Sequence, residues 1–264
     1  MTNRLSSSDA NFSVSLQNIA VRYRSPMEQI KSFKEFAIQF LKNNIHMTDF
    51  WALNDVSLTI QRGETFGIVG RNGAGKSTLL KVIARVISPT NGRVILHGKV
   101  VPLLELGAGF HPELTGRENI FLNAALLGHP QKETAANLPK IIEFAEVHGY
   151  IDAPLRTYST GMLARLGFAI ATFWQAEILI LDEILAVGDE EFKTKCDQKL
   201  AEFKQNGSTI IMVSHNLSTI QEKCDHVAWI DRGKLKSIGN PQEVIQCYLE
   251  DIKNVEAGKS IGTP

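Results

Sequence analysis

Apolar residues recur with two periods along this chain, and the alternation between these periods predicts a mixed α/β fold. Segments 177–182 and 209–214 are short runs of almost continuous apolar character, which is typical of parallel strands covered on both faces. Helical spacing of apolar residues is found over 79–87 and 192–203, and Gly207 stands just past the second of these helices. Together these segments predict a mostly parallel sheet with helices packed on it.

Alternation of apolar and polar residues marks a second group of strands, predicted at 14–16, 20–23 and 52–60. Further strands are predicted at 93–97 and 99–104, after the turn at 88–92. A hairpin is also predicted over 227–238, around the turn Asp231-Arg232-Gly233. Alternation is the pattern of strands with one face in water, so we expect an antiparallel β-subdomain beside the parallel sheet.

A long stretch with helical spacing lies between the two groups of strands that form the predicted core. It opens at Thr115-Gly116-Arg117-Glu118, a capping box in which the Thr and Glu side chains satisfy free N–H groups of the first turn, and it runs to about Trp174. We expect a helical subdomain over about 105–175, inserted into the α/β core.

The ends of the chain and one internal segment differ from this pattern. We expect a flexible tail over 1–12, one domain over 13–250 and a C-terminal tail over 251–264. Within the domain, residues 24–50 form an amphipathic insertion, with apolar residues at helical spacing over 27–41 and lysines on the other faces. This helix could pack on its own domain or lie against a membrane or a membrane subunit, and the pattern leaves both interpretations open.

The composition is that of an ordinary globular protein, with 44% apolar and 21% charged residues. The 28 Lys and Arg residues balance 28 Asp and Glu residues, so no electrostatic attraction to nucleic acid is implied. No apolar run approaches the roughly 18–20 residues that span a bilayer, and the first residues lack the apolar core of a secretion signal. The three scattered cysteines suit a reducing cytoplasm. Because no spanning segment is predicted, we expect any contact with a membrane to depend on a partner.

Residues 70–78 carry the strongest chemical signal. Their sequence, Gly70-Arg71-Asn72-Gly73-Ala74-Gly75-Lys76-Ser77-Thr78, fits the phosphate-binding loop G-x-x-x-x-G-K-[ST] and lies between a predicted strand and a predicted helix. In such loops backbone N–H groups surround the phosphates, the lysine reaches the terminal ones and the hydroxyl holds Mg²⁺. The glycines permit backbone turns and close approaches that a Cβ would block. We therefore predict a P-loop NTPase core that binds a nucleoside triphosphate.

Three residues after predicted strands can complete this site. Asp182 ends an apolar strand, from which it is expected to reach the Mg²⁺ shell, and the neighbouring Glu183 can polarise a water for attack on the γ-phosphate. His215 follows another apolar strand, where its side chain could touch the γ-phosphate. Each residue also has a simpler interpretation, as a loop cap for Asp182, a solvated carboxylate for Glu183 and a packing or surface residue for His215.

The segment Tyr158-Ser159-Thr160-Gly161-Met162 precedes the acidic strand by about twenty residues. Ser159 can cap a helix that begins near Gly161, whose free N–H groups and dipole then form a second anion site. Since residues 70–78 already account for the chain's own nucleotide, this second site is best explained as a contact with the triphosphate on another subunit. A phosphotransferase that used the P-loop alone would leave the segment unexplained.

With these motifs in this order, the chain resembles the ATP-binding cassette subunits of ABC transporters over roughly residues 13–250. The resemblance implies roles for single residues: Tyr23 stacks on adenine, Ser77 and Asp182 bind Mg²⁺, Glu183 is the general base, and Lys76 and His215 contact the terminal phosphate. It also implies that Ser159, Thr160, Gly161 and Met162 contact the ATP of a second subunit, and that Asp189 ends a loop that crosses the dimer.

Several motifs narrow the resemblance to cassettes that export lipid-linked polysaccharides, such as O-antigen, capsule and teichoic acid. They are L-E-L-G-A-G-F at 104–110, T-G-R-E-N at 115–119, Y-S-T-G-M at 158–162 and D-E-I-L-A-V-G-D at 182–189. The third departs from the common signature L-S-G-G-Q at three positions. Leu106 stands where most cassettes carry a glutamine that contacts the metal, so the resemblance leaves open which residue makes that contact.

The resemblance implies a homodimeric ATPase with ATP and Mg²⁺ as cofactors and no nucleic acid partner. It would energise outward transport of a lipid-linked polysaccharide through a separate membrane subunit, present in two copies, at the cytoplasmic face of the cell membrane. Two alternatives remain at this stage. The chain could serve another cargo, such as a lipid, a drug or an ion, or it could be a soluble ABC ATPase without a role in transport.

Overall fold

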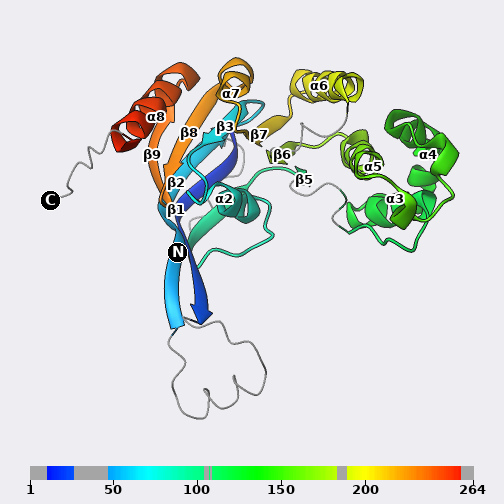
Figure 1. Cartoon of the computed structure of the whole chain (residues 1–264), viewed down its shortest axis with the longest axis horizontal. Coiled ribbons are helices and arrows are strands. Elements are labelled where there is room, and N and C mark those ends of the chain that lie inside the picture. The colour runs from blue at the N-terminus through cyan, green and yellow to red at the C-terminus, as the bar shows by residue number, and fades with distance from the viewer. Residues whose placement is uncertain (1–10, 27–46, 104–106, 108, 183–188, 257–264) are drawn as a thin grey trace, which may run out of the picture.

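The computed structural model describes residues 11–26, 47–103, 107, 109–182 and 189–256. Figure 1 shows a central sheet with helices beside it, a narrower sheet that extends into a long two-stranded ribbon, and a lobe of helices at one end of the molecule. This arrangement confirms the predicted α/β core with an antiparallel β-subdomain and a helical lobe. In the described part of the chain, no helix combines the length and the apolar character needed to cross a bilayer.

The larger sheet has six strands among the described residues, in the order β5-β6-β7-β3-β8-β9. All neighbouring pairs are parallel except the hairpin of β8 and β9. Every residue of β3 and β7 is buried, as expected for parallel strands covered on both faces. The strands are β3 (Thr65–Val69), β5 (Val100–Leu103), β6 (Ile178–Asp182), β7 (Thr209–Val213), β8 (His226–Asp231) and β9 (Lys234–Gly239).

This sheet separates two hydrophobic clusters. Along β6, Ile178 and Ile180 belong to the cluster that includes α2, whereas Leu179 and Leu181 belong to the cluster that includes α6, α7 and α8. The alternation follows from the two-residue period of a strand, which directs successive side chains to opposite faces. The helices are α2 (Lys76–Ile83), α6 (Glu190–Gln205), α7 (Leu217–Lys223) and α8 (Pro241–Glu256).

The smaller sheet is antiparallel and has the order β2-β1-β4. Its strands are β1 (Phe12–Pro26), β2 (Met47–Gln61) and β4 (Asn91–Leu96). The two short strands predicted at 14–16 and 20–23 are therefore one long strand. The register of β1 against β2 shifts between Leu16 and Val21, and Asn18 has a φ of 51°, so a bulge interrupts the alternation without ending the strand.

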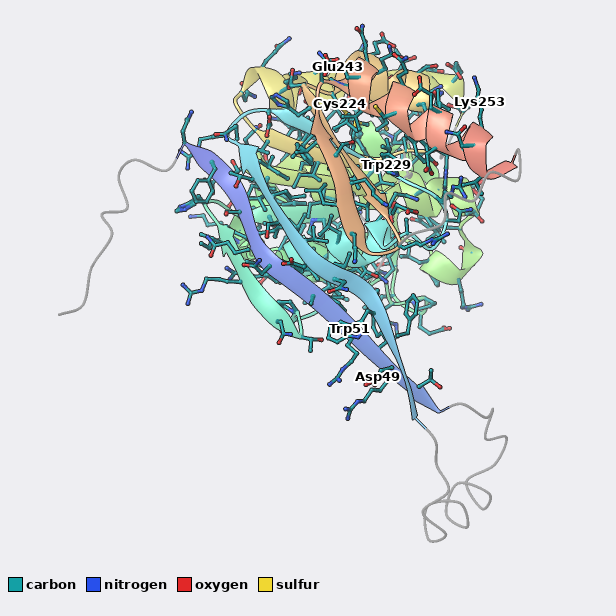
Figure 2. The ribbon with its side chains drawn as sticks, turned by 90° about the vertical axis from the view of Figure 1, so that its left-hand side faces the viewer. Asp49, Trp51, Cys224, Trp229, Glu243 and Lys253 are labelled. Atoms are coloured by element: carbon teal, nitrogen blue, oxygen red, sulfur yellow. The ribbon has the colours of Figure 1, made fainter. Side chains whose placement is uncertain are left out.

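The predicted insertion over 24–50 needs a correction at both ends. Pairing of β1 with β2 continues to Pro26 opposite Met47, so residues 24–26 and 47–50 are strand. Cross-strand contacts favour this extension, because Asp49 pairs with both Arg22 and Arg24 at 3.1 Å. Figure 2 shows Asp49 and Trp51 near the projecting end of the ribbon. The amphipathic pattern itself falls within 27–46, outside the described residues.

The stretch predicted to be helical contains α3 (Gly116–Leu126), α4 (Gln131–Ala145), α5 (Thr160–Phe173) and two short 3₁₀ turns, η1 (His148–Tyr150) and η2 (Leu155–Thr157). The predicted capping box is present, with the Thr115 hydroxyl accepting from the Glu118 N–H and the Glu118 carboxylate accepting from the Thr115 N–H. These helices enclose a hydrophobic cluster of their own, which includes Ile120, Ile141 and Leu166. The lobe thus carries a core distinct from those of the central sheet.

Both predicted tails are shorter than expected, because residue 12 lies in a strand and residues 251–256 lie in a helix. Phe12 begins β1, and its ring meets that of His97 edge-on at 4.8 Å, so the predicted tail over 1–12 does not reach its expected end. At the other end, α8 continues through Glu256 into the segment assigned to a tail from 251. Ile252 packs against the cluster under α8, which explains why the helix does not stop at Glu250.

Candidate functional site

The loop that joins β3 to α2 holds the phosphate-binding motif, and its glycines adopt the backbone geometry that the motif requires. Gly73 has a φ of 76° and Gly75 a φ of 107°, both in the region that L side chains rarely adopt. A Cβ on Gly75 would also lie 2.5 Å from the carbonyl oxygen of Ala52. The loop therefore needs glycine at these two positions for different reasons, conformation at Gly73 and both conformation and space at Gly75.

A second loop supports the first from the side. The Gly233 N–H, in the turn between β8 and β9, donates to the Ala74 carbonyl oxygen at 2.8 Å, and the Asn54 N–H donates to the Gly233 carbonyl oxygen at the same distance. Gly70 lies so close to the carbonyl oxygen of Ile230 that a Cβ would stand 2.1 Å from it. Sequence analysis predicted this turn but not its contact with the phosphate loop, because the partners are remote along the chain.

The side chain of Lys76 points back into the phosphate loop. Its side chain is buried, and its ammonium donates to the carbonyl oxygens of Gly70 at 2.7 Å and Arg71 at 3.0 Å. Burial lowers the pKa of Lys76, and the negative charge of Asp182 partly opposes that effect. A cation held in a dry loop interacts strongly with any anion that enters it.

Parallel strands bring the phosphate loop, Asp182 and His215 to one edge of the sheet. β3, β6 and β7 run in the same direction, so residues 70–78, Asp182 and His215 all follow the carboxyl ends of neighbouring strands. Burial raises the pKa of Asp182, while the charges of Lys76, Lys81 and His215 and a hydrogen bond from Ser77 act in the opposite direction. The structure therefore brings Lys76, Ser77, Asp182 and His215 into one electrostatic group.

The donor atoms at this edge fit Mg²⁺. The Ser77 hydroxyl and the Asp182 carboxylate already interact with each other, and both are the oxygen ligands that Mg²⁺ prefers. Across the described residues, no cluster of three or more His, Cys, Asp or Glu side chains could enclose an ion. Such a sparse donor set suits an ion that takes its other ligands from water and from substrate phosphates.

The other predicted positions around the loop are placed as follows. Asn72 is exposed and Thr78 half-buried in the first turn of α2. Arg71 lies 3.7 Å from Asp251 of α8, in an ion pair that the sequence did not reveal. Tyr23 lies on β1 directly opposite Phe50 of β2, with 45% of its surface exposed. Its ring is thus accessible at the surface of the smaller sheet.

Asp189 is the first described residue after a gap that begins at Glu183. Glu183, residues 184–188 and the Leu106 position lie outside the described residues. Asp189 caps α6, accepting from the Phe192 N–H at 3.0 Å, and also pairs with Arg165 of α5 at 2.5 Å. The hydrogen bond from Phe192, with the nearby Arg165, lowers the pKa of Asp189.

The segment 158–162 opens α5, as its sequence predicted. The Ser159 hydroxyl accepts from the Met162 N–H at 3.2 Å, and both Ser159 and Thr160 are exposed. Gly161 is half-buried on the first turn. Tyr158 is buried, and its hydroxyl donates to the Tyr150 carbonyl oxygen at 2.7 Å. The tyrosine therefore anchors the segment in the helical lobe while Ser159 and Thr160 face outward, and Met162 packs against the lobe's cluster.

The phosphate loop and this helix start belong to different parts of the chain. α2 packs in a cluster with the two sheets, whereas α5 packs mainly with α3 and α4 (Figure 1). The helix start is formed by residues within a few positions of each other, whereas the phosphate loop is joined by Asp182 and His215 from other strands. One chain thus carries the phosphate loop and the exposed start of α5 on parts with separate hydrophobic clusters.

Comparison with known proteins agrees with these motifs. The family described as ABC transporter matches residues 53–186. The O-antigen export system ATP-binding protein RfbB of Klebsiella pneumoniae is 50% identical over 214 residues, which cover 81% of this chain and 85% of that protein. The teichoic acids export ATP-binding protein TagH of Listeria monocytogenes serotype 4b is 42% identical over 245 residues, covering 92% of this chain and 71% of that protein.

Among solved structures, an ATP-binding cassette described as a dimer in a post-hydrolysis state with ADP and Pi has a TM-score of 0.68. It is 20% identical and covers 86% of this chain and 98% of its own, so this likeness concerns the fold alone. The family match and the relatives show a nucleotide-binding ATPase whose hydrolysis is coupled to transport. The chain belongs to the ABC transporter family, among the ATP-binding subunits that include the O-antigen and teichoic acid export proteins.

Proposed function

We propose that this chain is the motor subunit of an exporter that moves a lipid-linked polysaccharide outward. Its partner would be a separate membrane permease in two copies, and it would work at the cytoplasmic face of the cell membrane without nucleic acid. The similarity to O-antigen and teichoic acid export proteins supports the cargo class, because it extends over most of this chain.

ATP would bind on residues 70–78. Lys76 would exchange its hydrogen bonds to the carbonyl oxygens of Gly70 and Arg71 for bonds to the β- and γ-phosphates. The exposed ring of Tyr23 would stack on adenine. Ser77 and Asp182 would hold Mg²⁺, which when bound offsets negative charge on the β- and γ-phosphate oxygens.

Hydrolysis would use one carboxylate and one histidine. Glu183 would accept a proton from water as the water oxygen bonds to the γ-phosphorus. The bond between that phosphorus and the β–γ bridging oxygen then breaks, so that ADP and inorganic phosphate are formed. His215, at the end of β7, would contact the γ-phosphate and respond to its loss.

The observation that carries the mechanism is the exposed start of α5 on a lobe with its own core. Two copies paired head to tail would place Ser159, Thr160, Gly161 and Met162 of one against the ATP held by the other. The free N–H groups and the helix dipole at this point favour an anion. Asp189, at the start of α6, would lie in the same dimer interface.

Reconstitution with the permease tests both parts of this proposal. We expect Lys76→Ala to lose nucleotide binding, and Glu183→Gln to keep binding but accumulate a closed dimer with ATP. In proteoliposomes, a lipid-linked polysaccharide should stimulate hydrolysis by the wild-type complex. Near-normal turnover by the Gln variant would overturn the role of Glu183, and stimulation by an unrelated lipid or drug alone would overturn the cargo class.

A further inference from the structure

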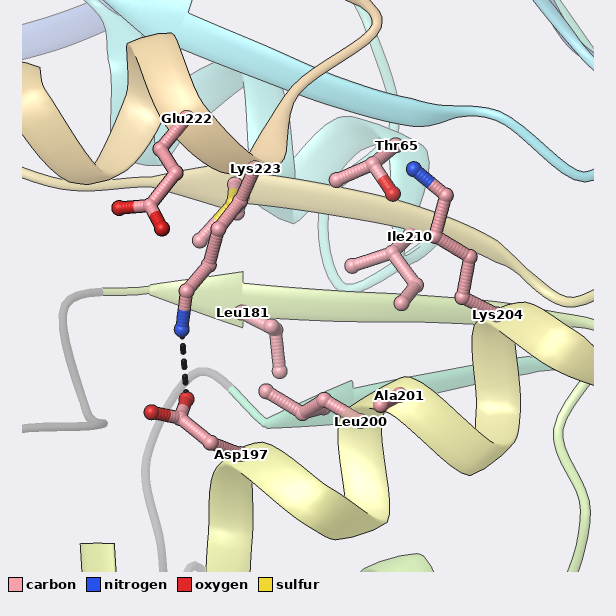
Figure 3. Close-up of a pocket in the computed structure, with 10 residues that line it drawn as sticks. Thr65, Leu181, Asp197, Leu200, Ala201, Lys204, Ile210, Glu222 and Lys223 are labelled. Atoms are coloured by element: carbon pink, nitrogen blue, oxygen red, sulfur yellow. Dashed lines mark hydrogen bonds and ion pairs between the residues drawn. The ribbon is translucent and has the colours of Figure 1, made fainter. Parts of the chain in front are cut away.

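A cavity of about 400 Å³ lies between α6 and α7, on the face of the central sheet that these helices cover (Figure 3). Its floor is apolar and consists of Leu181, Ile210 and Met212 from β6 and β7. Leu200 and Ala201 of α6 form one wall. Sites for small molecules are typically of this size and are lined mostly by apolar side chains, with a few polar groups that orient the ligand.

One polar side chain that carries no charge lines this cavity. Thr65, the first residue of β3, is only 3% exposed and lines the cavity. Its backbone N–H donates to the Asp225 carboxylate at 2.7 Å. Figure 3 shows the Thr65 hydroxyl directed into the space beside Ile210. A hydroxyl at the wall of an apolar cavity is the kind of polar group that can orient a ligand there.

The charged residues at the mouth largely neutralise one another. The Lys223 ammonium lies 2.6 Å from the Asp197 carboxylate, and the Lys204 ammonium lies 3.1 Å from that of Asp225. Glu222 is exposed at the edge and has no such pair among the described residues. Since both lysines are already neutralised, the cavity offers no cation to an anionic ligand, and its floor offers no charge at all.

We propose that this cavity is an effector site for a small, neutral aliphatic molecule that carries one hydroxyl group. The aliphatic part would lie on Leu181, Ile210 and Met212, and its hydroxyl would bond to Thr65. The helices α6 and α7 flank the cavity and would carry the effect of binding to the site of ATP hydrolysis. α6 begins directly after Asp189, and α7 begins two residues after His215, so an occupant contacts the helices that position both residues. This effect on hydrolysis rests on the proposed function.

Binding can be tested on the full chain with 1-octanol as the probe. In methyl-labelled protein, octanol is expected to shift the NMR signals of Leu200, Ile210 and Met212 in a saturable manner. Octane, octanoate and octylammonium serve as matched probes that lack the hydroxyl or carry a charge, and each should bind more weakly. The absence of saturable shifts with octanol would overturn the site, and equal binding of octane would overturn the role of the hydroxyl.

Two substitutions locate the site. Thr65→Val keeps the side-chain shape and removes the hydroxyl, so octanol binding should weaken about fivefold while octane binding is unchanged. Ala201→Leu suits a helix and fills the cavity from an exposed position of α6, so it should abolish binding of both. Thr59→Val and Ala135→Leu, at exposed positions outside the cavity, are the matched controls and should bind octanol as the wild type does. Full binding by Ala201→Leu would place octanol elsewhere and overturn the assignment.

The effector role has its own measurement. Octanol is expected to change the steady-state ATP hydrolysis rate of the wild type at least about twofold, and this response should vanish in Ala201→Leu but persist in Ala135→Leu. Saturable binding without any change in rate would overturn the effector role. Because binding is measured without nucleotide, and basal hydrolysis without octanol, failure of this inference is distinguishable from failure of the proposed function.

Discussion

The residues of the phosphate loop differ in how much a single methyl group should disturb them. Gly75 combines a φ of 107° with a carbonyl oxygen 2.5 Å from the position of a Cβ, whereas Gly73 has a φ of 76° and open space around it. We expect Gly75→Ala to lower the free energy of unfolding by about 3 kcal/mol or to abolish folding, and Gly73→Ala to lower it by about 1 kcal/mol.

Gly149→Ala provides the control for this series, because a Cβ there meets nothing within 4 Å and the backbone is not left-handed. Its stability should remain within about 0.5 kcal/mol of the wild type. Chemical denaturation with urea measures all three variants. A Gly75→Ala protein as stable as Gly149→Ala would show that the loop relaxes freely, contrary to the close packing against Ala52.

Asp182 should make stability depend on pH in an unusual direction for a carboxylate. Because burial raises its pKa above 3.8, the folded protein holds this proton to a higher pH than the unfolded chain does. Stability contributed by this group therefore falls as pH rises from 3.8 through the folded-state pKa. Asp182→Asn removes the buried charge and should be about 1 kcal/mol more stable than the wild type at pH 7, with a difference that shrinks toward pH 4.

Urea denaturation of both proteins across this pH range measures the effect. The same substitution should lower ATP hydrolysis about tenfold or more, because it removes a proposed Mg²⁺ ligand. A stability gain together with a loss of activity would show that this carboxylate is retained for function at a cost to the fold. Equal stability at pH 7 would mean that Lys76, Ser77 and their neighbours fully offset its burial.

At the scale of elements, the start of α5 separates a structural role from a functional one. Ser159→Ala should destabilise the helical lobe by about 1 kcal/mol, because the Met162 N–H loses its acceptor. Ser159→Asp keeps an acceptor and suits the helix dipole, so stability should be retained. The same carboxylate would repel the γ-phosphate proposed to bind there, so ATP hydrolysis should fall at least about tenfold.

Thr115→Ala is the matched control, since Thr115 caps α3 in the same lobe without a proposed contact to nucleotide. It should lose about as much stability as Ser159→Ala while hydrolysis per folded protein stays near that of the wild type. Thermal unfolding and steady-state hydrolysis, measured on the same samples, distinguish the two roles. Full activity in Ser159→Asp would exclude a phosphate contact at this helix start.

Elements defined by nearby residues could be predicted from the sequence, and those defined by remote contacts could not. The caps at Thr115 and Ser159 each depend on residues within three positions, and both are present as predicted. The contact of Gly233 with Ala74 joins residues far apart in the chain, so no local pattern announces it. The same limit applies to β4 and β5, which are close in sequence but belong to different sheets.

Errors at element ends have a similar cause. The interruption near Asn18 resembled a strand end because a bulge and a strand end disturb alternation equally. α8 extends past 250 because Ile252 reaches the core, which depends on the position of the central sheet. The cavity between α6 and α7 arises from the distance between two helices, and no spacing of residues within either helix encodes it.

At the scale of the whole molecule, the proposed mechanism makes each active site depend on two chains. Residues 70–78 and 158–162 lie on parts with separate cores, so a chain damaged in one part keeps the other intact. Lys76→Ala removes the nucleotide-binding half of a site, and Ser159→Asp removes the opposing half. Each variant alone should hydrolyse ATP at about a tenth of the wild-type rate or less, because every site in its homodimer lacks one half.

Mixing these two variants tests this dependence directly. In a mixed dimer, Lys76 of one chain and Ser159 of the other form one undamaged site. With equal amounts and random exchange, half of the dimers are mixed and each holds one of two sites, so hydrolysis should recover to about a quarter of the wild-type rate. A mixture of Lys76→Ala with Asp182→Asn damages the same half twice and should recover nothing. If the first mixture stays as slow as either variant alone although exchange is verified by labelled chains, each site is completed within one chain and the head-to-tail arrangement is wrong.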